Sequence, residues 1–312
     1  MHSLVQLEYI IAVDTYGQFS IAADKCFVTQ PTLSMQIKKL ENDMDIIIFD
    51  RTKQPVVATE IGRKIIDQAR IILAESKKID EIVKANKDTV SGTLKLGVIP
   101  SVAPYLMPLF IGKLLKKFPA LHVNVHEMIT EEILEALDKE TLDVGIISTP
   151  VHGETCKEIP IYYEQIYIYC HPDHPFYQKN KVSIKELSEE NIWLLSQGHC
   201  FRSQVLNICA LKEKDAELNF TYESASIETL IKLVDKEGGL TLIPELAIND
   251  LSPTKKKGVK LIKDMHPVRE IGLVTNRLFV KERSLQALEQ TIRSVLSKEI
   301  QDPKRGSVVD WN

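Results

Sequence analysis

The sequence predicts an all-α N-terminal part, one long connecting helix and a C-terminal α/β part. Three observations support this division: helical apolar spacing with short breaks in the first part, a heptad repeat along one long helix in the second, and alternating strand and helix patterns in the third. A chain of 312 residues is also longer than one ordinary domain. The predicted parts span residues 1–58, 59–90 and 91–300, and a polar tail that we expect to be disordered spans 301–312.

The composition indicates a soluble globular protein, with 44% hydrophobic and 26% charged residues. No apolar run reaches the ~20 residues that cross a bilayer, and Glu8 and Asp14 interrupt any N-terminal export signal. We therefore expect a cytoplasmic protein without membrane contact, whose thiols are kept reduced. The net charge of −4 gives no overall sign of a nucleic-acid partner. The odd number of cysteines, five, argues against a fully paired disulfide framework, and we expect neither a metal nor a cofactor.

Two short helices joined by a tight turn are predicted between Ile21 and Leu40. Pro31 stands near the start of the second helix, where its missing N–H donor does no harm. Leu33, Ile37 and Leu40 form the apolar face of that helix, and the opposite face carries polar, amide and basic side chains. This pattern is typical of a helix-turn-helix that reads the DNA major groove. A plain helical bundle with a solvated face shows the same pattern, so the pattern alone leaves both interpretations open.

One long helix is predicted from Thr59, which can cap it, to about Asp88. Its apolar positions follow a heptad seam interrupted by one serine: Ile65, Ala69, Ile72, Ser76, Ile79 and Val83. Such a seam suits a two-helix contact between subunits. A helix that packs on its own domain is the alternative.

Strands and helices alternate after Ser91. The expected strands are Thr93–Val98, His122–Glu127 and Asp143–Ser148, and the helices between them are Pro104–Lys117 and Thr130–Lys139. This βαβαβ order predicts a parallel sheet with helices on its faces.

A second α/β unit is predicted from about Glu164, and the chain returns to the first unit near residue 268. Its expected elements, with those of the return, are Ile166–Cys170, Thr229–Lys236, Leu240–Ile243, Ile271–Thr275 and Glu282–Ser297. Two crossovers between Rossmann-like lobes produce a hinged cleft, as in periplasmic binding proteins. Lobe I spans about 91–163 and 268–300, and lobe II about 164–267.

The stretch from Gly198 to Cys209 contains two cysteines in different settings. Cys200 directly follows His199 and precedes Arg202 by two residues, and neighbouring cations lower the pKa of a thiol. If a helix starts here, its positive end also favours the thiolate. Cys209 lies on the apolar face of that helix. Cys200 is therefore a candidate reactive thiol, whereas the plainer alternative is one core cysteine and one idle surface thiol.

The spacing of the two cysteines matters if this stretch is helical. Nine helical steps correspond to roughly 13 Å of rise, but a disulfide requires Cα atoms within about 7 Å. A bond between Cys200 and Cys209 would therefore require the segment to unwind, which turns a local oxidation into a change of shape.

Ser101 follows the strand that ends at Val98. Loops at the carboxyl ends of parallel strands are common ligand sites, so Ser101 is expected to face the cleft. A serine that only caps the next helix is the alternative.

The N-terminal motifs resemble those of LysR-type transcriptional regulators. The resemblance rests on Phe19–Ala23, on Val28–Glu41, which contains Gln-Pro-Thr-Leu-Ser-Met-Gln-Ile-Lys-Lys-Leu-Glu, and on Phe49–Thr52. It implies a winged helix-turn-helix and a dimerising linker helix. It also implies that Gln30, Pro31, Thr32 and Ser34 face bases or phosphates, that Lys38 holds the DNA backbone, and that Arg51 enters the minor groove.

Further motifs resemble the hydrogen-peroxide-sensing members of that family. They are Gly97–Leu106, Gly198-His199-Cys200-x-Arg202, Cys209 and Ser226–Leu230. By this resemblance Cys200 is the peroxidatic cysteine and Cys209 the resolving one, which join as a disulfide. The implied peroxide pocket contains Ser101, Thr130, His199, Arg202 and Arg269. Ser101 replaces a family threonine, and Ser203 stands where relatives often have aspartate.

The sequence thus predicts a peroxide-activated transcription regulator that is not an enzyme. Its expected partners are promoter DNA, RNA polymerase, hydrogen peroxide, a glutaredoxin- or thioredoxin-type reductant, and further copies of itself in a homodimer or homotetramer. One alternative is a LysR-type regulator whose cleft binds an organic effector, with Cys200 and Cys209 incidental. Another is a thiol peroxidase, against which the helix-turn-helix and the heptad helix argue.

Overall fold

The computed structural model describes residues 2–85, 89–151, 156–190, 192–209 and 226–311; Asp88, where the sequence placed the end of the long helix, falls outside them. The chain forms two compact units, one of Met1–Thr89 with Leu278–Lys281 and the other of Val90–Arg277 with Glu282–Asn312. Among the described helices, none is long and apolar enough to cross a membrane.

The first unit is a helix-turn-helix followed by a small hairpin. Its elements are α1 (Leu4–Tyr16), α2 (Phe19–Lys25), α3 (Gln30–Met44), β1 (Phe49–Asp50), β2 (Val57–Ala58) and α4 (Glu60–Ala85). Helix α3 begins where the Thr29 hydroxyl accepts a hydrogen bond from the Thr32 N–H. Leu33, Ile37 and Leu40 are fully buried against α1 and α2, which confirms the predicted apolar face. The antiparallel β1–β2 hairpin forms the wing.

The two halves of α4 differ in their surroundings. The Thr59 hydroxyl accepts a hydrogen bond from the Gly62 N–H at 3.0 Å and caps the helix, as predicted. Ala69, in the first half, is buried in the core of the unit, whereas Ile79 is 63% exposed and Val83 is 55% exposed. The first half therefore packs on its own domain, and the second half leaves the heptad seam uncovered within this chain.

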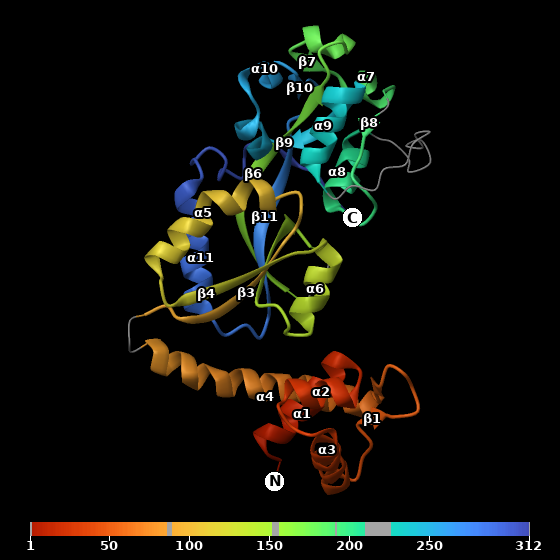
Figure 1. The fold of residues 1–312 in the computed structure, drawn as a ribbon, viewed down its shortest axis with the longest axis vertical. Helices are drawn as coiled ribbons and strands as arrows, with labels where there is room; N and C mark the ends of the chain where they lie inside the picture. Colours follow the sequence, from red (N-terminus) through yellow and green to blue (C-terminus); the bar gives the residue numbers. More distant parts are fainter. Residues whose placement is uncertain (1, 86–88, 152–155, 191, 210–225, 312) are drawn as a thin grey trace. The chain divides into compact units, whose positions relative to one another are not determined.

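The second unit is built on a mixed sheet in the order β4-β3-β5-β11-β6-β10-β7. Its lobe I elements are β3 (Gly92–Val98), α5 (Ala103–Lys117), β4 (Leu121–Glu127), α6 (Thr130–Asp138), β5 (Val144–Thr149), the first half of β6 (Cys156–Cys170), β11 (Pro267–Asn276) and α11 (Glu282–Val295). Strand β3 pairs in parallel with both β4 and β5, which confirms the predicted βαβαβ order. Helices α5 and α11 pack together on one face of these strands and α6 covers the other (Figure 1).

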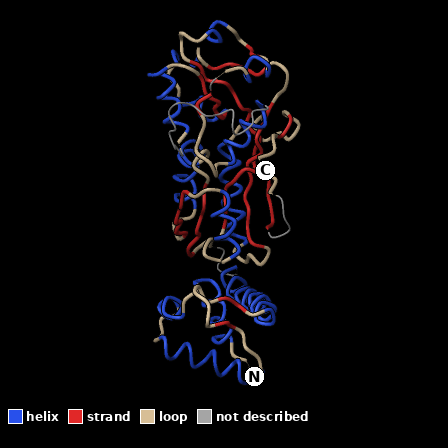
Figure 2. Tube along the Cα trace, turned by 90° about the vertical axis from the view of Figure 1, so that its right-hand side faces the viewer, coloured by secondary structure: helices blue, strands red, loops and turns tan. Residues whose placement is uncertain are grey.

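The two lobes share long strands. Strand β6 pairs with β11 along Cys156–Gln165 and with β9 and β10 towards Cys170, so it runs through the predicted lobe boundary without a break. The sequence predicted only its last third, Ile166–Cys170. Figure 2 shows these strands from the side with the helices beside them. The crossover between the lobes is therefore a paired strand, which holds residues from both lobes in fixed register.

Lobe II contains many short elements. They are η1 (Pro175–Gln178), β7 (Lys181–Val182), α7 (Ile184–Ser188), β8 (Ile192–Trp193), α8 (Cys200–Cys209), α9 (Ile227–Glu237), β9 (Leu240–Pro244), η3 (Glu245–Asp250), α10 (Pro253–Lys256) and β10 (Val259–Ile262). Strand β9 pairs with β6 and with β8, and β10 pairs with β6 and with β7. Helix α9 packs against β9, and α8 contacts α7.

The C-terminal tail is ordered, contrary to the expectation of disorder. Residues Ser307–Val308 form β12, which pairs in parallel with the start of β11. Val309 and Trp311 are buried. The expectation rested on the polar composition of the segment, but two apolar side chains and backbone pairing are enough to dock it.

Candidate functional site

The two cysteines of the predicted switch stand at opposite ends of α8. Cys200 is its first residue and Cys209 its last, and both thiols are free and buried. Gly198 enters the helix with φ +84°, and a Cβ there would lie 3.4 Å from Ile129 Cδ1, just before α6. The predicted helix is therefore confirmed. Its intact form separates the two cysteines by roughly 13 Å along the axis.

A buried arginine from the crossover strand lies next to Cys200. The Arg269 side chain is 0% exposed, and its Nη1 donates to Ser101 Oγ at 2.8 Å while Nη2 donates to the Ser101 carbonyl at 2.9 Å. Its Nε donates to Glu164 Oε1 at 2.7 Å. The guanidinium also lies 4.9 Å from the centroid of the Phe201 ring, directly after Cys200. These contacts fix a positive charge among residues from both lobes.

The pKa of the Cys200 thiol is raised, which contradicts the expectation that neighbouring cations lower it. Burial is the largest cause, and it outweighs the nearby Arg269 charge, a hydrogen bond from Thr130 and the Phe201 backbone N–H. The exposed carboxylate of Glu131 adds a smaller rise. The residues next to Cys200 in the sequence do not indicate that its thiol is buried. The cation that favours the thiolate is Arg269, 69 residues away in the chain.

His199 and Arg202, the predicted cations beside the thiol, lie at the start of α8, and their role in a peroxide pocket stays a prediction. Burial lowers the pKa of His199, with Glu131 opposing, so its imidazole is neutral at neutral pH. Its backbone carbonyl instead accepts the Arg202 N–H at the start of α8. The Arg202 guanidinium donates to the Leu195 carbonyl at 2.8 Å. Both residues therefore help to shape the entrance of α8.

Thr130 acts on the Cys200 thiol and Ser101 contacts Arg269, both from lobe I, and their role in a peroxide pocket stays a prediction. The buried Thr130 hydroxyl has no hydrogen-bond partner among the described residues when Cys200 is a thiol, and it is placed to donate to the Cys200 thiolate. Ser101 is buried and holds Arg269 through its hydroxyl and its carbonyl. The structure therefore brings Ser101, Thr130 and Arg269 together around Cys200.

Three further cysteines have raised thiol pKa values as well. Burial raises the pKa of Cys209 to about 12 and that of Cys170 to about 11. The Cys170 thiol also donates to the Gly258 carbonyl at 3.3 Å. Burial is likewise the main reason that the pKa of Cys26 is raised. Within the described part of the chain, no cluster of three or more His, Cys, Asp or Glu side chains could hold a metal.

Sequence reasoning missed Glu164 and Gln204. Glu164 stands opposite Arg269 in the β6–β11 pairing and is fully buried. Gln204 lies one helical turn after Cys200, is fully buried, and donates to Ser148 Oγ at 3.1 Å. A glutamine four residues after the candidate cysteine, on the same face of a predicted helix, was the available signal for Gln204. Glu164 offered none, because its importance depends on long-range strand register.

The predicted DNA-contacting side chains lie on the open side of α3. Gln30, Pro31, Thr32 and Lys38 are exposed and Ser34 is half-buried. Because the apolar side of α3 is buried in the core, these residues share an accessible face suited to a DNA groove.

Arg51, expected to enter the minor groove, is held against α3. Its Nη1 donates to Ser34 Oγ and its Nη2 to Glu41 Oε2, both at 3.2 Å, and its guanidinium lies 4.8 Å from the Phe19 ring centroid. The buried Glu41 carboxylate also accepts the Ile48 N–H at 2.9 Å, so it joins the wing to α3. A role in the groove requires Arg51 to leave these partners.

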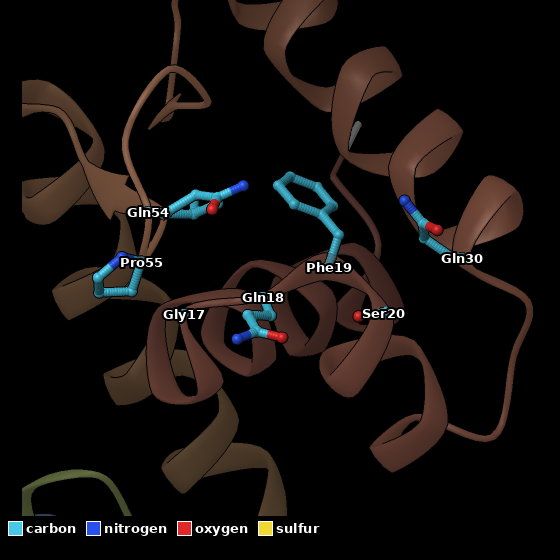
Figure 3. A pocket seen from close by; sticks show the side chains of 8 residues that line it. Gly17, Gln18, Phe19, Ser20, Gln30, Gln54 and Pro55 are labelled. Atoms are coloured by element: carbon cyan, nitrogen blue, oxygen red, sulfur yellow. The ribbon is translucent and has the colours of Figure 1, made fainter.

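A cavity of about 510 Å³ lies between the wing and the helix-turn-helix. It is lined by Gly17, Gln18, Phe19, Ser20, Gln30, Gln54, Pro55 and Val56. Gln54 extends from the wing towards the Phe19 ring, and Gln30 comes from the first turn of α3 (Figure 3). An amide both donates and accepts hydrogen bonds. Gln54 is therefore a polar wing residue that the sequence did not single out.

Two family models match most of the chain. The model described as "Bacterial regulatory helix-turn-helix protein, lysR family" matches residues 4–63. The model described as "LysR substrate binding domain" matches residues 87–297.

Individual relatives agree with these matches. A hydrogen peroxide-inducible genes activator of Haemophilus influenzae is 36% identical over 299 residues, which cover 93% of this chain and 97% of that protein. The DNA-binding transcriptional dual regulator OxyR of Escherichia coli is 36% identical over 271 residues, covering 86% and 87%. Among solved structures, a full-length OxyR variant of Pseudomonas aeruginosa matches with a TM-score of 0.76 at 30% identity, covering 94% of this chain and 98% of that one. The chain belongs to the LysR family of bacterial transcriptional regulators.

Proposed function

We propose that this protein is a hydrogen-peroxide-sensing transcription activator, switched by oxidation of Cys200 and formation of a disulfide with Cys209. The observation that carries the proposal is the pairing of Cys200 at the start of α8 with the buried Arg269 charge, while a second free thiol ends the same helix. The similarity to peroxide-inducible activators along nearly the whole chain supports it.

The chemistry proceeds in two steps. The Cys200 thiolate attacks one oxygen of hydrogen peroxide, the O–O bond breaks, and hydroxide leaves and takes a proton to become water, which leaves Cys200 as a sulfenic acid. The Cys209 thiol then attacks that sulfur, the S–O bond breaks, and a second water leaves. In total two thiols lose two electrons, and one peroxide becomes two molecules of water.

The residues around Cys200 suit the first step. Negative charge develops on the departing oxygen, and fixed donors aimed at it lower the barrier. Arg269 is held rigidly by Ser101 and Glu164, so it meets that charge without rearranging. The Thr130 hydroxyl is free to donate to the thiolate or to peroxide. Such hydrogen-bond donors suit a small, polar, uncharged substrate.

The second step is the switch. Because the cysteines end one intact helix, Cys209 reaches Cys200 only if α8 unwinds. Cys209 leaves an apolar setting in which it is fully buried. The local oxidation is therefore coupled to the packing of lobe II, and through it to the arrangement of the oligomer on DNA.

The remaining partners follow from the same proposal. The exposed face of α3 binds promoter DNA in the cytoplasm, and the uncovered half of the α4 seam joins two copies into a dimer, which further pairs into a tetramer. RNA polymerase is recruited by the activated form. A glutaredoxin- or thioredoxin-type reductant resets the disulfide. Each thiol pair reacts once per activation, so the protein does not act as a peroxidase.

The deciding experiment maps thiols by labelling and mass spectrometry before and after about one equivalent of hydrogen peroxide, with footprinting on promoter DNA in parallel. We expect Cys200 and Cys209 alone to become linked and the footprint to shift, and Cys156→Ser to behave as the unmodified protein. If both thiols stay free while an organic effector shifts the footprint of a Cys200→Ser, Cys209→Ser variant, the protein reads that effector instead. Steady consumption of peroxide with a reductant would identify a peroxidase.

A further inference from the structure

The C-terminal segment 306–311, which we term the C-terminal strap, is docked by backbone pairing. The Ser307 N–H donates to the His266 carbonyl and the Val309 N–H donates to the Val268 carbonyl, both at 2.9 Å. A Cβ at Gly306 would lie 2.3 Å from the His266 carbonyl oxygen, so only glycine permits this approach. Its last residues, Val309 and Trp311, are 7% and 8% exposed. The strap is thus part of the folded second unit.

Two side chains of α8 hold the strap, and both lie between the two cysteines. Gln204 Nε2 donates to the Val309 carbonyl at 3.0 Å, and Asn207 Nδ2 donates to the Asp310 carbonyl at 2.8 Å. The accepting carbonyls are backbone atoms whose positions follow from the pairing of β12 with β11. The end of the chain lies beside α8 (Figure 1). The segment that the sequence predicted to be a disordered tail is therefore hydrogen-bonded to α8.

We propose that the C-terminal strap holds α8 in its helical dithiol form and that disulfide formation releases the strap. Gln204 and Asn207 are then positioning residues for the reaction of Cys209 with Cys200. This inference rests on the proposed redox switch. Unwinding of the segment between the cysteines moves Gln204 and Asn207 away from fixed carbonyls, so both hydrogen bonds are lost.

The direction of the effect follows from linkage. Contacts made only in the dithiol form stabilise it relative to the disulfide, and their removal favours the disulfide. One hydrogen bond changes an equilibrium by roughly two- to tenfold. Loss of the Asn207 bond should therefore shift the dithiol–disulfide equilibrium roughly two- to tenfold towards the disulfide, and tenfold corresponds to about 30 mV. Loss of the whole strap should shift it further.

The equilibrium is measured on the full-length protein in glutathione buffers, where the dithiol and oxidised glutathione exchange with the disulfide and two reduced glutathiones. Asn207→Ala is the informative variant, because alanine has a higher helix propensity than asparagine. An effect on the helix alone would therefore disfavour the disulfide, opposite to the loss of the strap. Asn207→Asp, which keeps the shape but cannot donate, should shift the equilibrium in the same direction as Asn207→Ala. A stop codon after Arg305 removes the whole strap.

Hydrogen exchange provides a readout of the strap itself and does not depend on any variant. In the dithiol protein the Ser307 and Val309 amides should exchange slowly, and after oxidation they should exchange at least tenfold faster. The proposed role of the strap is contradicted if the Cys200–Cys209 disulfide forms while these amides keep their protection, or if Asn207→Ala favours the dithiol. In either case the redox switch itself still stands. If neither peroxide nor oxidised glutathione links the two cysteines, the proposed function and the strap both fail.

Discussion

Arg269 and Glu164 stand directly opposite each other in the β11–β6 pairing and form an ion pair that is 0% exposed, with Nη2 2.6 Å from Oε1. Glu164 Oε2 also accepts the Leu246 N–H at 3.2 Å. The carboxylate therefore orients the guanidinium while Arg269 donates to Ser101 in lobe I and faces Cys200 in lobe II. Because the pair belongs to the strands that cross between the lobes, the geometry around the thiol depends on their register.

Replacing this arginine should impair both reactivity and folding. In Arg269→Met the Cys200 thiolate loses its cation and peroxide loses a donor, so we expect the rate of Cys200 oxidation to fall about 10²–10³-fold. Glu164 is left as a buried unpaired charge, which should lower the free energy of unfolding by about 3–5 kcal/mol. Quenched thiol labelling measures the rate, and urea denaturation measures the stability.

The double variant Arg269→Met, Glu164→Gln separates the two effects. Without the unpaired carboxylate, most of the lost stability should return, whereas the oxidation rate should stay low. Recovery of the rate together with the stability would mean that Arg269 acts only as a structural partner of Glu164.

The rate of Cys200 oxidation should rise with pH. Burial raises the pKa of this thiol above its usual 9.0, so the protonated form predominates below that pH and the reactive thiolate is a minor species. We expect about a tenfold faster reaction for each pH unit between 7 and 8. The pKa of His199 is lowered, so its titration lies below this window. Peroxide kinetics on a Cys209→Ser background would contradict this if the rate stayed constant from pH 7 to 8.

Thr130→Val should slow oxidation without weakening the fold. The two side chains have nearly the same shape, and the buried Thr130 hydroxyl has no hydrogen-bond partner among the described residues while Cys200 is protonated. Because that hydroxyl favours the Cys200 thiolate, we expect about a tenfold lower oxidation rate. The melting temperature should be unchanged or higher. Equal losses of rate and stability would show that the hydroxyl acts through packing instead.

The sequence predicted well what depends on local periodicity. The apolar face of α3, the cap of α4 by Thr59 and the βαβαβ order of lobe I all follow from spacing within one segment, and the structure confirms them. The start of α8 at Cys200 was also predicted from its apolar spacing.

Features that depend on distant partners were missed. Strand β12 has two residues and exists because it pairs with β11, so no local pattern announces it. The first half of β6 contains Pro160 and charged residues, which hid a strand that its neighbours stabilise. The pKa of Cys200 follows from burial and from a distant arginine, so inference from His199 and Arg202 gave the wrong direction.

Charges on the exposed half of α4 should separate the subunits. Ile79 and Val83 are seam positions that stay largely exposed in one chain, so a partner helix gains by covering them. Ile79→Asp with Val83→Asp should convert the proposed dimer to a monomer in analytical ultracentrifugation. Lys77→Asp, outside the seam, is the matched control and should leave the dimer intact. A dimer that survives both seam charges would place the subunit contact elsewhere.

Two α3 substitutions should distinguish base reading from backbone binding. Gln30 lies in the first turn, where an amide can pair with a base edge, so Gln30→Ala should weaken binding to the promoter about 5- to 100-fold while binding to random DNA changes little. The Lys38 side chain is 59% exposed, so its ammonium can leave its long contact with Glu41 and reach a phosphate. Lys38→Ala should weaken binding to both DNAs and reduce the slope of log K against log salt by about one.

Arg51 also bonds to Glu41, so its role in DNA binding needs a separate test. Its guanidinium bonds to Ser34 and Glu41 in the free protein, so binding to a groove requires those bonds to break. If Arg51 contacts DNA, Arg51→Ala should reduce the salt slope as Lys38→Ala does. If it only fixes the wing on α3, the salt slope should stay unchanged, while affinity falls and the first unit loses stability. Fluorescence anisotropy at several salt concentrations, with thermal unfolding of the same variants, decides between these roles.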